Sequence, residues 1–282
     1  MIPVGKLKSN LQFNKNLGDL IEVMKLAATL QFNQFRLKQE PSSEFLTLLD
    51  DLFGVLLGVG AGNELLKPRE DLPSLLVLIS SDEGFLGELN FLLANTLLNN
   101  RRRNDIIACT GLQGANYLRE IHVDFSFFDS PGEKLDSKVL ASLRDFILGQ
   151  YLKKKIGRVY IVYSRFISIS SQQVEIEMLI PLLSSRQAQK SSVENLLVEP
   201  NLRSVAEGWV KSWLDFKLYQ IFWSSKLSEL AARIMHLEGS VQELRRINSR
   251  LNMEYFKYLH GLSDKSIREL TAARLINKEK DE

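Results

Sequence analysis

The chain has 282 residues, of which 45% are hydrophobic and 25% are charged, and its formal net charge at pH 7 is +2. This composition is typical of a globular protein with a buried core, and the near-neutral charge requires neither nucleic acid nor an acidic membrane as partner. The single cysteine, Cys109, excludes an internal disulfide and a metal site built from several cysteines. The N-terminus MIPVGKLKSN lacks the apolar segment of a secretory signal, and no apolar run reaches the roughly 18 residues of a membrane span. We therefore expect a soluble chain whose link to any membrane runs through a partner.

Residues 6–37 predict a long amphipathic helix. They contain no proline and one glycine, and their apolar positions recur every three or four residues. These positions are Leu17, Leu20, Ile21, Met24, Ala27, Ala28, Leu30 and Phe35. Pro41 follows, the segment 42–57 is again helical in pattern, and the glycine-rich segment 58–62 predicts a loop.

The middle of the chain alternates between strand and helix patterns. Five short apolar runs rich in β-branched residues predict strands. They are SLLVLI at 74–79, DIIACTG at 105–111, HVDFSFF at 122–128, RVYIVYSRF at 158–166 and QQVEIEMLIPLL at 172–183. Helical patterns over 85–100, after 111 and over 136–155 separate them. This interleaving predicts a compact α/β domain over 74–185 with a largely parallel sheet.

The C-terminal part predicts one very long helix. From 202 nothing breaks a helix until at least Gly239, and the apolar positions step by three and four, close to a heptad repeat. They are Leu227, Ala231, Ile234, Leu237, Val241, Leu244, Ile247 or Asn248, Leu251, Tyr255, Tyr258 and Leu262. A helix over 202–275 would be about 100 Å long, longer than such an α/β domain is wide. Only the N-terminal helix is long enough to pair with it, so we predict an antiparallel coiled coil.

Five stretches, in order along the chain, resemble the gamma subunits of rotary (F-type) ATP synthases. They are EVMKLAA at 22–28, SSDEGFLGELN at 80–90, the strand pair and Leu-Pro end at 157–182, VEP at 198–200 and LSELAARI at 227–234. The sequence departs from the family pattern at three positions of the second stretch: Glu83 replaces arginine, Leu86 replaces cysteine and Glu88 replaces glycine. The family's Tyr-Asn-x-x-Arg-Gln segment is also degraded to YFKYLHGLS at 255–263. We expect a divergent member, such as one from an alternative ATPase operon.

The resemblance implies an N-terminal coiled-coil helix over 1–60, a central Rossmann-like α/β domain over 74–185 and a C-terminal coiled-coil helix over 200–278. It also implies a central rotor shaft that couples proton or sodium flow to conformational change at catalytic sites on other subunits. The implied partners are the alpha and beta ATPase subunits, the epsilon subunit and the membrane c-ring, with one copy of this chain per complex. The implied location is peripheral, on the cytoplasmic face of a bacterial plasma membrane. No catalytic residue, cofactor, metal, nucleic acid or direct small-molecule substrate is expected.

The resemblance and local charge together indicate two contact regions. Contact with the catalytic ring is expected at Met24, Lys25, Arg233, Arg245, Arg246 and Arg250, of which the last three rest on charge and position alone. Contact with the rotor ring is expected at Val198 and Glu199. The alternative interpretations are a coiled-coil core position for Met24, an exposed turn for 198–199, and a solvated helix face with pairs such as Glu229 with Arg233.

Other functions find less support in the sequence. There is no GxxxxGK[ST] loop for nucleotide phosphates, no GxSxG elbow, and the three histidines show no metal-ligand spacing. The turn 81–87 could bind an anion, but Asp82 and Glu83 would repel a phosphate. Two alternatives stay open: a coiled-coil adaptor with an α/β head, and a small-molecule enzyme whose ligand pocket would lie at the strand carboxyl ends.

Overall fold

The computed structural model describes residues 4–38, 69, 71–132, 134–181 and 201–278, together with residues 41, 44, 45, 47–49 and 51. The chain divides into two compact units, Met1–Ala27 with His236–Glu282, and Ala28–Met235. Two helices, α1 (Val4–Lys38) and α6 (Leu202–Lys278), contribute to both units. The expected helix at 42–57 lies mostly outside the described residues, and the expected loop at 58–62 lies wholly outside them.

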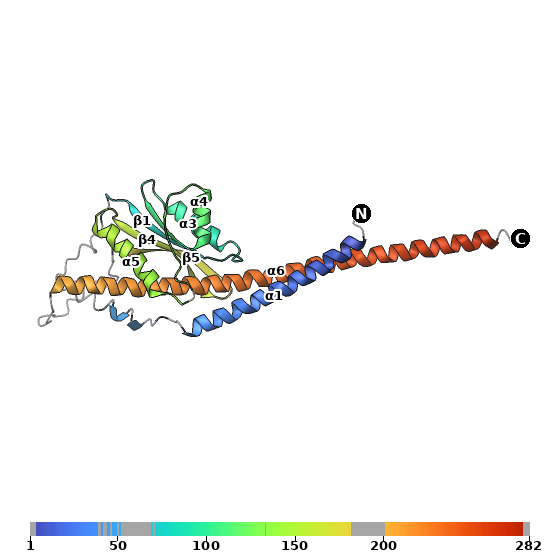
Figure 1. Cartoon of the computed structure of the whole chain (residues 1–282), viewed down its shortest axis with the longest axis horizontal. Coiled ribbons are helices and arrows are strands. Elements are labelled where there is room, and N and C mark those ends of the chain that lie inside the picture. Colours follow the sequence, from blue (N-terminus) through green and yellow to red (C-terminus); the bar gives the residue numbers. More distant parts are fainter. Residues whose placement is uncertain are drawn as a thin grey trace. The chain divides into compact units, whose positions relative to one another are not determined.

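The first unit is an antiparallel pair formed by α1 and α6 (Figure 1). Glu22 binds Arg245 at 2.7 Å, and Lys25 binds Glu238 at 2.7 Å. Residue numbers therefore decrease along α6 while they increase along α1, which is the order of an antiparallel pair. Buried or half-buried positions recur in a seven-residue pattern on both helices. They include Leu7, Leu11, Asn14, Ile21 and Met24 on α1, and Leu237, Val241, Leu244, Asn248, Leu251, Tyr255 and Tyr258 on α6. The predicted coiled-coil pairing is therefore confirmed.

Some apolar positions of the expected stripes are exposed instead. Leu20 is 57% exposed, Leu30 is 53% exposed and Leu262 is 45% exposed. A helix with one partner can cover only one stripe, and these side chains lie off it or beyond the paired length. Of the two candidates for one core position, Asn248 is half-buried, whereas Ile247 is 39% exposed. The core of the coiled coil therefore contains a polar residue.

The second unit contains a five-stranded sheet in the order β3-β2-β1-β4-β5. Its strands are β1 (Ser74–Ile79), β2 (Ile106–Thr110), β3 (Ser126–Phe128), β4 (Arg158–Ser168) and β5 (Ser171–Ile180). Pairing is parallel except between β4 and β5, which confirms the expected sheet. Val77 in the central strand pairs with Ala108 and with Ile161. All six residues of β1 are buried, which explains its unbroken apolar sequence.

Helices cover both faces of this sheet (Figure 1). Leu76 and Leu78 face a core shared with α3 (Leu89–Asn100) and α4 (Leu112–Glu120). Leu75, Val77 and Ile79 face the opposite core, shared with α5 (Ser137–Leu152) and the first half of α6. The long C-terminal helix thus forms part of the α/β core before it enters the coiled coil. Within the described ranges, no helix combines the length and apolar character needed to cross a bilayer.

Candidate functional site: a long helix tied to the α/β domain

Among the described residues, polar contacts join α6 to the rest of the second unit, and five of them lie between Asp215 and Arg233. They are Asp215 with Arg144 of α5, Lys217 with Glu177 of β5 at 2.6 Å, Ser224 with the backbone N–H of Phe166 at 3.0 Å, Ser228 with Ser164, and Arg233 with Glu83 at 2.8 Å. The first and last of these residues are 18 positions apart, or roughly 27 Å along the helix. Apolar packing resists separation but gives little resistance to sliding, whereas hydrogen bonds are directional. These contacts therefore fix both the rotation and the axial position of α6.

The most buried of these contacts joins two hydroxyl groups. Ser164 of β4 is 1% exposed, Ser228 of α6 is 0% exposed, and their Oγ atoms form a hydrogen bond. A hydroxyl group enclosed in a protein core is stable only when it has a hydrogen-bond partner. The pair therefore sets the register between strand and helix at one defined point.

Arg233 lies in a buried cluster of alternating charges. Its guanidinium group binds Glu229 and Glu83, each at 2.8 Å, and Lys226 binds the same carboxylate of Glu229 at 3.0 Å. Arg233 is 6% exposed and Glu229 is 8% exposed. The pair of Glu229 with Arg233 is present, but it is buried and does not lie on the solvated helix face of the alternative interpretation. Glu83, which stands where the family pattern has arginine, supplies the second counter-charge.

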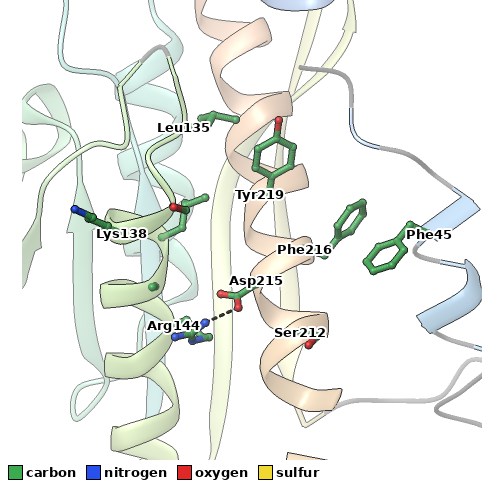
Figure 2. A pocket seen from close by; sticks show the side chains of 11 residues that line it. Phe45, Leu135, Lys138, Arg144, Ser212, Asp215, Phe216 and Tyr219 are labelled. Carbon is green, nitrogen blue, oxygen red and sulfur yellow. Dashed lines mark hydrogen bonds and ion pairs between the residues drawn. The ribbon is translucent and has the colours of Figure 1, made fainter. Parts of the chain in front are cut away.

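A hollow of about 660 Å³ lies beside α6 in the helix layer (Figure 2). It is lined by α5, by α6, by Leu135 and by Phe45, whose ring contacts that of Phe216 at 4.8 Å between centroids. At its base Arg144 binds Asp215, and hydrogen bonding to Asp145 is the largest cause that raises the pKa of Arg144. No strand residue lines this hollow, so it is not the strand-end crevice in which α/β domains bind ligands.

The strand-end crevice itself is filled by the protein's own groups. At the start of α4, the Leu112 N–H donates to Asp82 Oδ1 at 3.2 Å, the Gln113 N–H to the Ser81 carbonyl at 3.0 Å and the Gly114 N–H to Ser80 Oγ at 2.9 Å. These are the donors with which a helix N-terminus would bind an anion. A Cβ on Gly111, whose φ is +88°, would lie 2.2 Å from the Ser80 carbonyl oxygen. The contact is therefore too close for any other residue.

Little space remains at this edge of the sheet. The cavity beside Ile79, Ser80 and Lys226 has a volume of about 20 Å³, which suits one water molecule. In the described part of the chain, no group of three or more histidine, cysteine or acidic residues is placed to hold a metal. The ligand pocket that the enzyme alternative requires is not found here among the described residues.

The residues expected to contact the catalytic ring fall into two groups. Lys25 and Arg233 already bind carboxylates of this chain, and Met24 is half-buried in the coiled coil. Arg245 and Arg246 also pair with carboxylates, those of Glu22 and Glu243, but their side chains are 71% and 63% exposed. Arg250 is also exposed, one helical turn after Arg246. The three arginines are thus the accessible members of the set.

The two residues expected at the rotor ring, Val198 and Glu199, lie outside the described residues. Sequence reasoning missed Glu83 and the Ser164–Ser228 pair. The sequence shows Glu83 as a departure from the family pattern, but its ion-pair partner, Arg233, lies 150 positions further along the chain. No local signal links the two serines either, because only the fold brings strand β4 to helix α6.

The chain combines an antiparallel coiled coil with an α/β domain, and residues of α6 contribute to both. A family model described as ATP synthase matches residues 4–258, and the chain belongs to this family. The ATP synthase gamma chain of Clostridium perfringens strain SM101 is 25% identical over 276 residues, which cover 94% of this chain and 95% of that one. The gamma chain of Mycoplasmopsis pulmonis is 24% identical over 273 residues, which cover 95% and 97%. The resemblance to gamma subunits is confirmed.

Solved structures share the fold. The rotor of Euglena gracilis mitochondrial ATP synthase in rotational state 1 has a chain that superposes with a TM-score of 0.66, at 15% identity, with coverage of 92% of this chain and 98% of that one. A second structure of the same enzyme, of its OSCP/F1/c-ring part in rotational state 3, gives a TM-score of 0.69 at 14% identity, with coverage of 96% and 93%. The expected fold class, long terminal helices with a central Rossmann-like α/β domain, is confirmed.

Proposed function

We propose that this chain is the central rotor shaft of a rotary ATP synthase or ATPase and carries no catalytic site. Its partners are the alpha and beta subunits of the catalytic ring, the epsilon subunit and the membrane c-ring, with one copy of this chain per complex. It couples proton or sodium flow to conformational change in the ring. One observation carries the proposal: α6, with 77 residues, belongs both to the α/β core and to the coiled coil.

A single helix of this length transmits torque through its own backbone. At about 1.5 Å per residue it is roughly 115 Å long, and every turn is closed by hydrogen bonds. The polar contacts of Asp215, Ser228 and Arg233 prevent α6 from turning within the α/β domain. Rotation imposed on the domain therefore reaches the coiled coil without slip.

The coiled coil is asymmetric, so identical catalytic subunits arranged around it would contact different surfaces. One face presents the exposed arginines 246 and 250, whereas the α1 side presents the exposed apolar residues Leu20, Val23 and Leu26. Each catalytic subunit then meets a different surface at each shaft angle. A conformational equilibrium shifts only when contacts differ between states, so the shaft angle sets the state of each site.

The decisive experiment is co-expression of this chain with the two large ATPase subunits encoded beside its gene. Native mass spectrometry then gives the stoichiometry of the purified complex, and ATP hydrolysis is compared with and without this chain. We expect one copy per six large subunits and sustained turnover only when the chain is present. Failure to associate, or self-assembly alone, would refute the shaft function and favour the adaptor.

The accessible arginines provide a finer test of ring contact. We expect the double variant Arg246→Gln and Arg250→Gln to weaken coupled ion pumping by up to about thirtyfold, since each of the two exposed charge contacts contributes at most about 1 kcal/mol. The matched control is Arg103→Gln, an exposed arginine in the α/β domain. Equal rates of ion pumping by the wild type, the double variant and the Arg103→Gln control would show that Arg246 and Arg250 do not take part in the torque contact.

For the location, we propose the cytoplasmic face of a bacterial plasma membrane. The chain would be held there through the rotor ring, with Val198 and Glu199 at that contact. Cysteines placed at 198 and 199 should form disulfides with cysteines on the exposed loops of the membrane ring. Absence of such crosslinks in an assembled complex would move the contact elsewhere.

A further inference from the structure

Charge is distributed unequally between the two edges of the parallel sheet. The loop 101–105 precedes β2 and the loop 153–157 precedes β4, so both lie at the edge where the parallel strands begin. Their exposed cations include Arg102, Lys153, Lys154 and Lys155, and we call these four residues the basic edge. At the opposite, carboxyl edge lies the turn 80–88, whose charged residues are Asp82, Glu83 and Glu88.

Hydrogen bonds hold the two basic loops on either side of the start of β1. Asp105 accepts the Ser74 N–H at 2.8 Å with one carboxylate oxygen and the Arg102 N–H at 2.8 Å with the other. The Gly157 N–H donates to the Pro73 carbonyl at 2.8 Å. Because neighbouring strands lie about 4.8 Å apart, the starts of β2 and β4 are roughly 10 Å from each other. The four cations therefore form one surface.

The cations of the basic edge have no counter-charge of their own. Among the residues that the structure describes, none of the four forms an ion pair. Asp105 is buried, and both of its oxygens are used by backbone N–H groups. Three exposed carboxylates lie at the same edge, and further exposed arginines outweigh them; these carboxylates belong to Asp71, Glu120 and Asp124. The edge therefore carries a positive potential.

One apolar side chain lies among these charges. Leu152, the last residue of α5, is 53% exposed and directly precedes Lys153. The stem of a lysine is apolar too, and it can lie along an apolar surface while the charged end reaches a polar layer. Cations around an exposed leucine match the interface of a bilayer, where headgroups overlie acyl chains. A site for single-stranded nucleic acid would interleave aromatic side chains, and neither loop contains one.

The course of α6 shows which way the basic edge faces. Arg233 lies two residues before the end of the second unit and binds Glu83, four residues after β1, at 2.8 Å. Helix α6 therefore leaves this unit at the carboxyl edge of the sheet, and the basic edge is the opposite one. If the coiled coil stands in the catalytic ring, as proposed, the membrane lies on the side of the basic edge.

We propose that the basic edge binds the surface of an anionic lipid bilayer, with its cations on headgroup phosphates and Leu152 in the interface beneath them. The contact goes beyond the shaft function, because it adds lipid to the attachment through the membrane ring, and it rests on that function for the choice of a membrane over an acidic protein. Each lysine or arginine near such a surface contributes about fivefold in binding, and salt screens the attraction beyond about 8 Å. The attachment is therefore reversible and sensitive to salt.

The first test measures binding of the full-length chain to lipid vesicles by flotation. The vesicles contain phosphatidylcholine alone or phosphatidylcholine mixed with phosphatidylglycerol. We expect binding to the anionic vesicles at low salt, release at high salt and little binding to the neutral vesicles. The triple variant Lys153→Gln, Lys154→Gln and Lys155→Gln should bind about a hundredfold more weakly, with an unchanged melting temperature because these side chains are exposed and unpaired in the described structure.

Two controls show whether position or total charge matters. Replacement of the same three lysines by arginine keeps the charge and should keep the binding. The second control removes three charges elsewhere and should bind like the wild type; it combines Lys257→Gln, Lys265→Gln and Arg268→Gln on the exposed end of α6. Wild-type binding by the lysine-to-glutamine variant at 153–155, or an equal loss in this second control, would overturn the proposal.

A second test distinguishes lipid from the protein of the membrane ring. A benzophenone amino acid replaces Leu152 in the assembled complex, which is reconstituted in the anionic vesicles. We expect a crosslink to phosphatidylglycerol, whereas a crosslink to a protein subunit alone would overturn the lipid contact and leave the shaft function intact. If no complex assembles, the shaft function fails, and flotation of the chain by itself still decides whether the basic edge binds lipid.

Discussion

Removal of one buried hydroxyl from the Ser164–Ser228 pair should destabilise the second unit more than removal of both. Ser228→Ala leaves the Ser164 hydroxyl at 1% exposure with its partner gone, and Ser164→Ala does the same to Ser228. An orphaned buried polar group costs about 1–3 kcal/mol. For a unit of this size, a loss near 2 kcal/mol lowers the melting temperature by about 4–8 °C.

The double variant Ser164→Ala with Ser228→Ala removes both polar groups and leaves none orphaned. We expect its free energy of unfolding to lie within about 1 kcal/mol of the wild-type value. Urea unfolding of the full-length chain, followed by circular dichroism, gives all four values of the double-mutant cycle. The coupling energy should reach at least about 1 kcal/mol. If the losses of unfolding free energy in the two single variants simply add in the double variant, the two hydroxyl groups do not interact energetically. That result would refute the claim that the Ser164–Ser228 pair sets the register between β4 and α6.

Three further predictions concern other parts of the chain. Asn248→Leu should stabilise the coiled coil in urea unfolding by about 1 kcal/mol, because it replaces a half-buried polar side chain at a core position. Cys109 should not react with thiol reagents at neutral pH until the chain unfolds, because burial raises the pKa of its thiol to about 12. A hydrogen bond from Lys25 lowers the pKa of Glu238 below its ordinary 4.5, so this group stabilises the fold above pH 4.5 and the contribution is lost as pH falls through the lowered pKa. When the free energy of unfolding is measured at decreasing pH, the Lys25→Met variant should lack this loss of stability.

Periodicity along the chain was sufficient to predict the long helices and the parallel sheet. The heptad steps around Leu237 and Val241 and the fully apolar run of β1 have direct physical causes, namely a one-sided partner helix and burial on both faces. Periodicity could not decide which apolar residues of α1 face the partner. Leu20 and Leu30 fit a helical spacing as well as Ile21 does, and only the partner's position distinguishes them.

The candidate site was less accessible from sequence because its contacts are distant along the chain. The departure at Glu83 is visible by comparison with the family pattern, but its role as counter-charge to Arg233 depends on β1 lying beside α6. The family resemblance placed Arg233 among the residues expected to contact the catalytic ring, whereas the structure places it in a buried cluster with Glu229.

The antiparallel pairing of α1 with the end of α6 has a consequence for synthesis of the chain. Helix α1 is complete once Lys38 is made, but the segment of α6 that pairs with its first half begins at His236. At about 5–20 residues per second, the ribosome needs on the order of 10–40 seconds to make the intervening chain. Throughout that interval the core stripe of α1, from Leu7 to Ile21, has no helix to cover it. The nascent N-terminus is therefore a substrate for chaperones that shield apolar helices, and premature termination before α6 leaves a product that cannot bury this stripe.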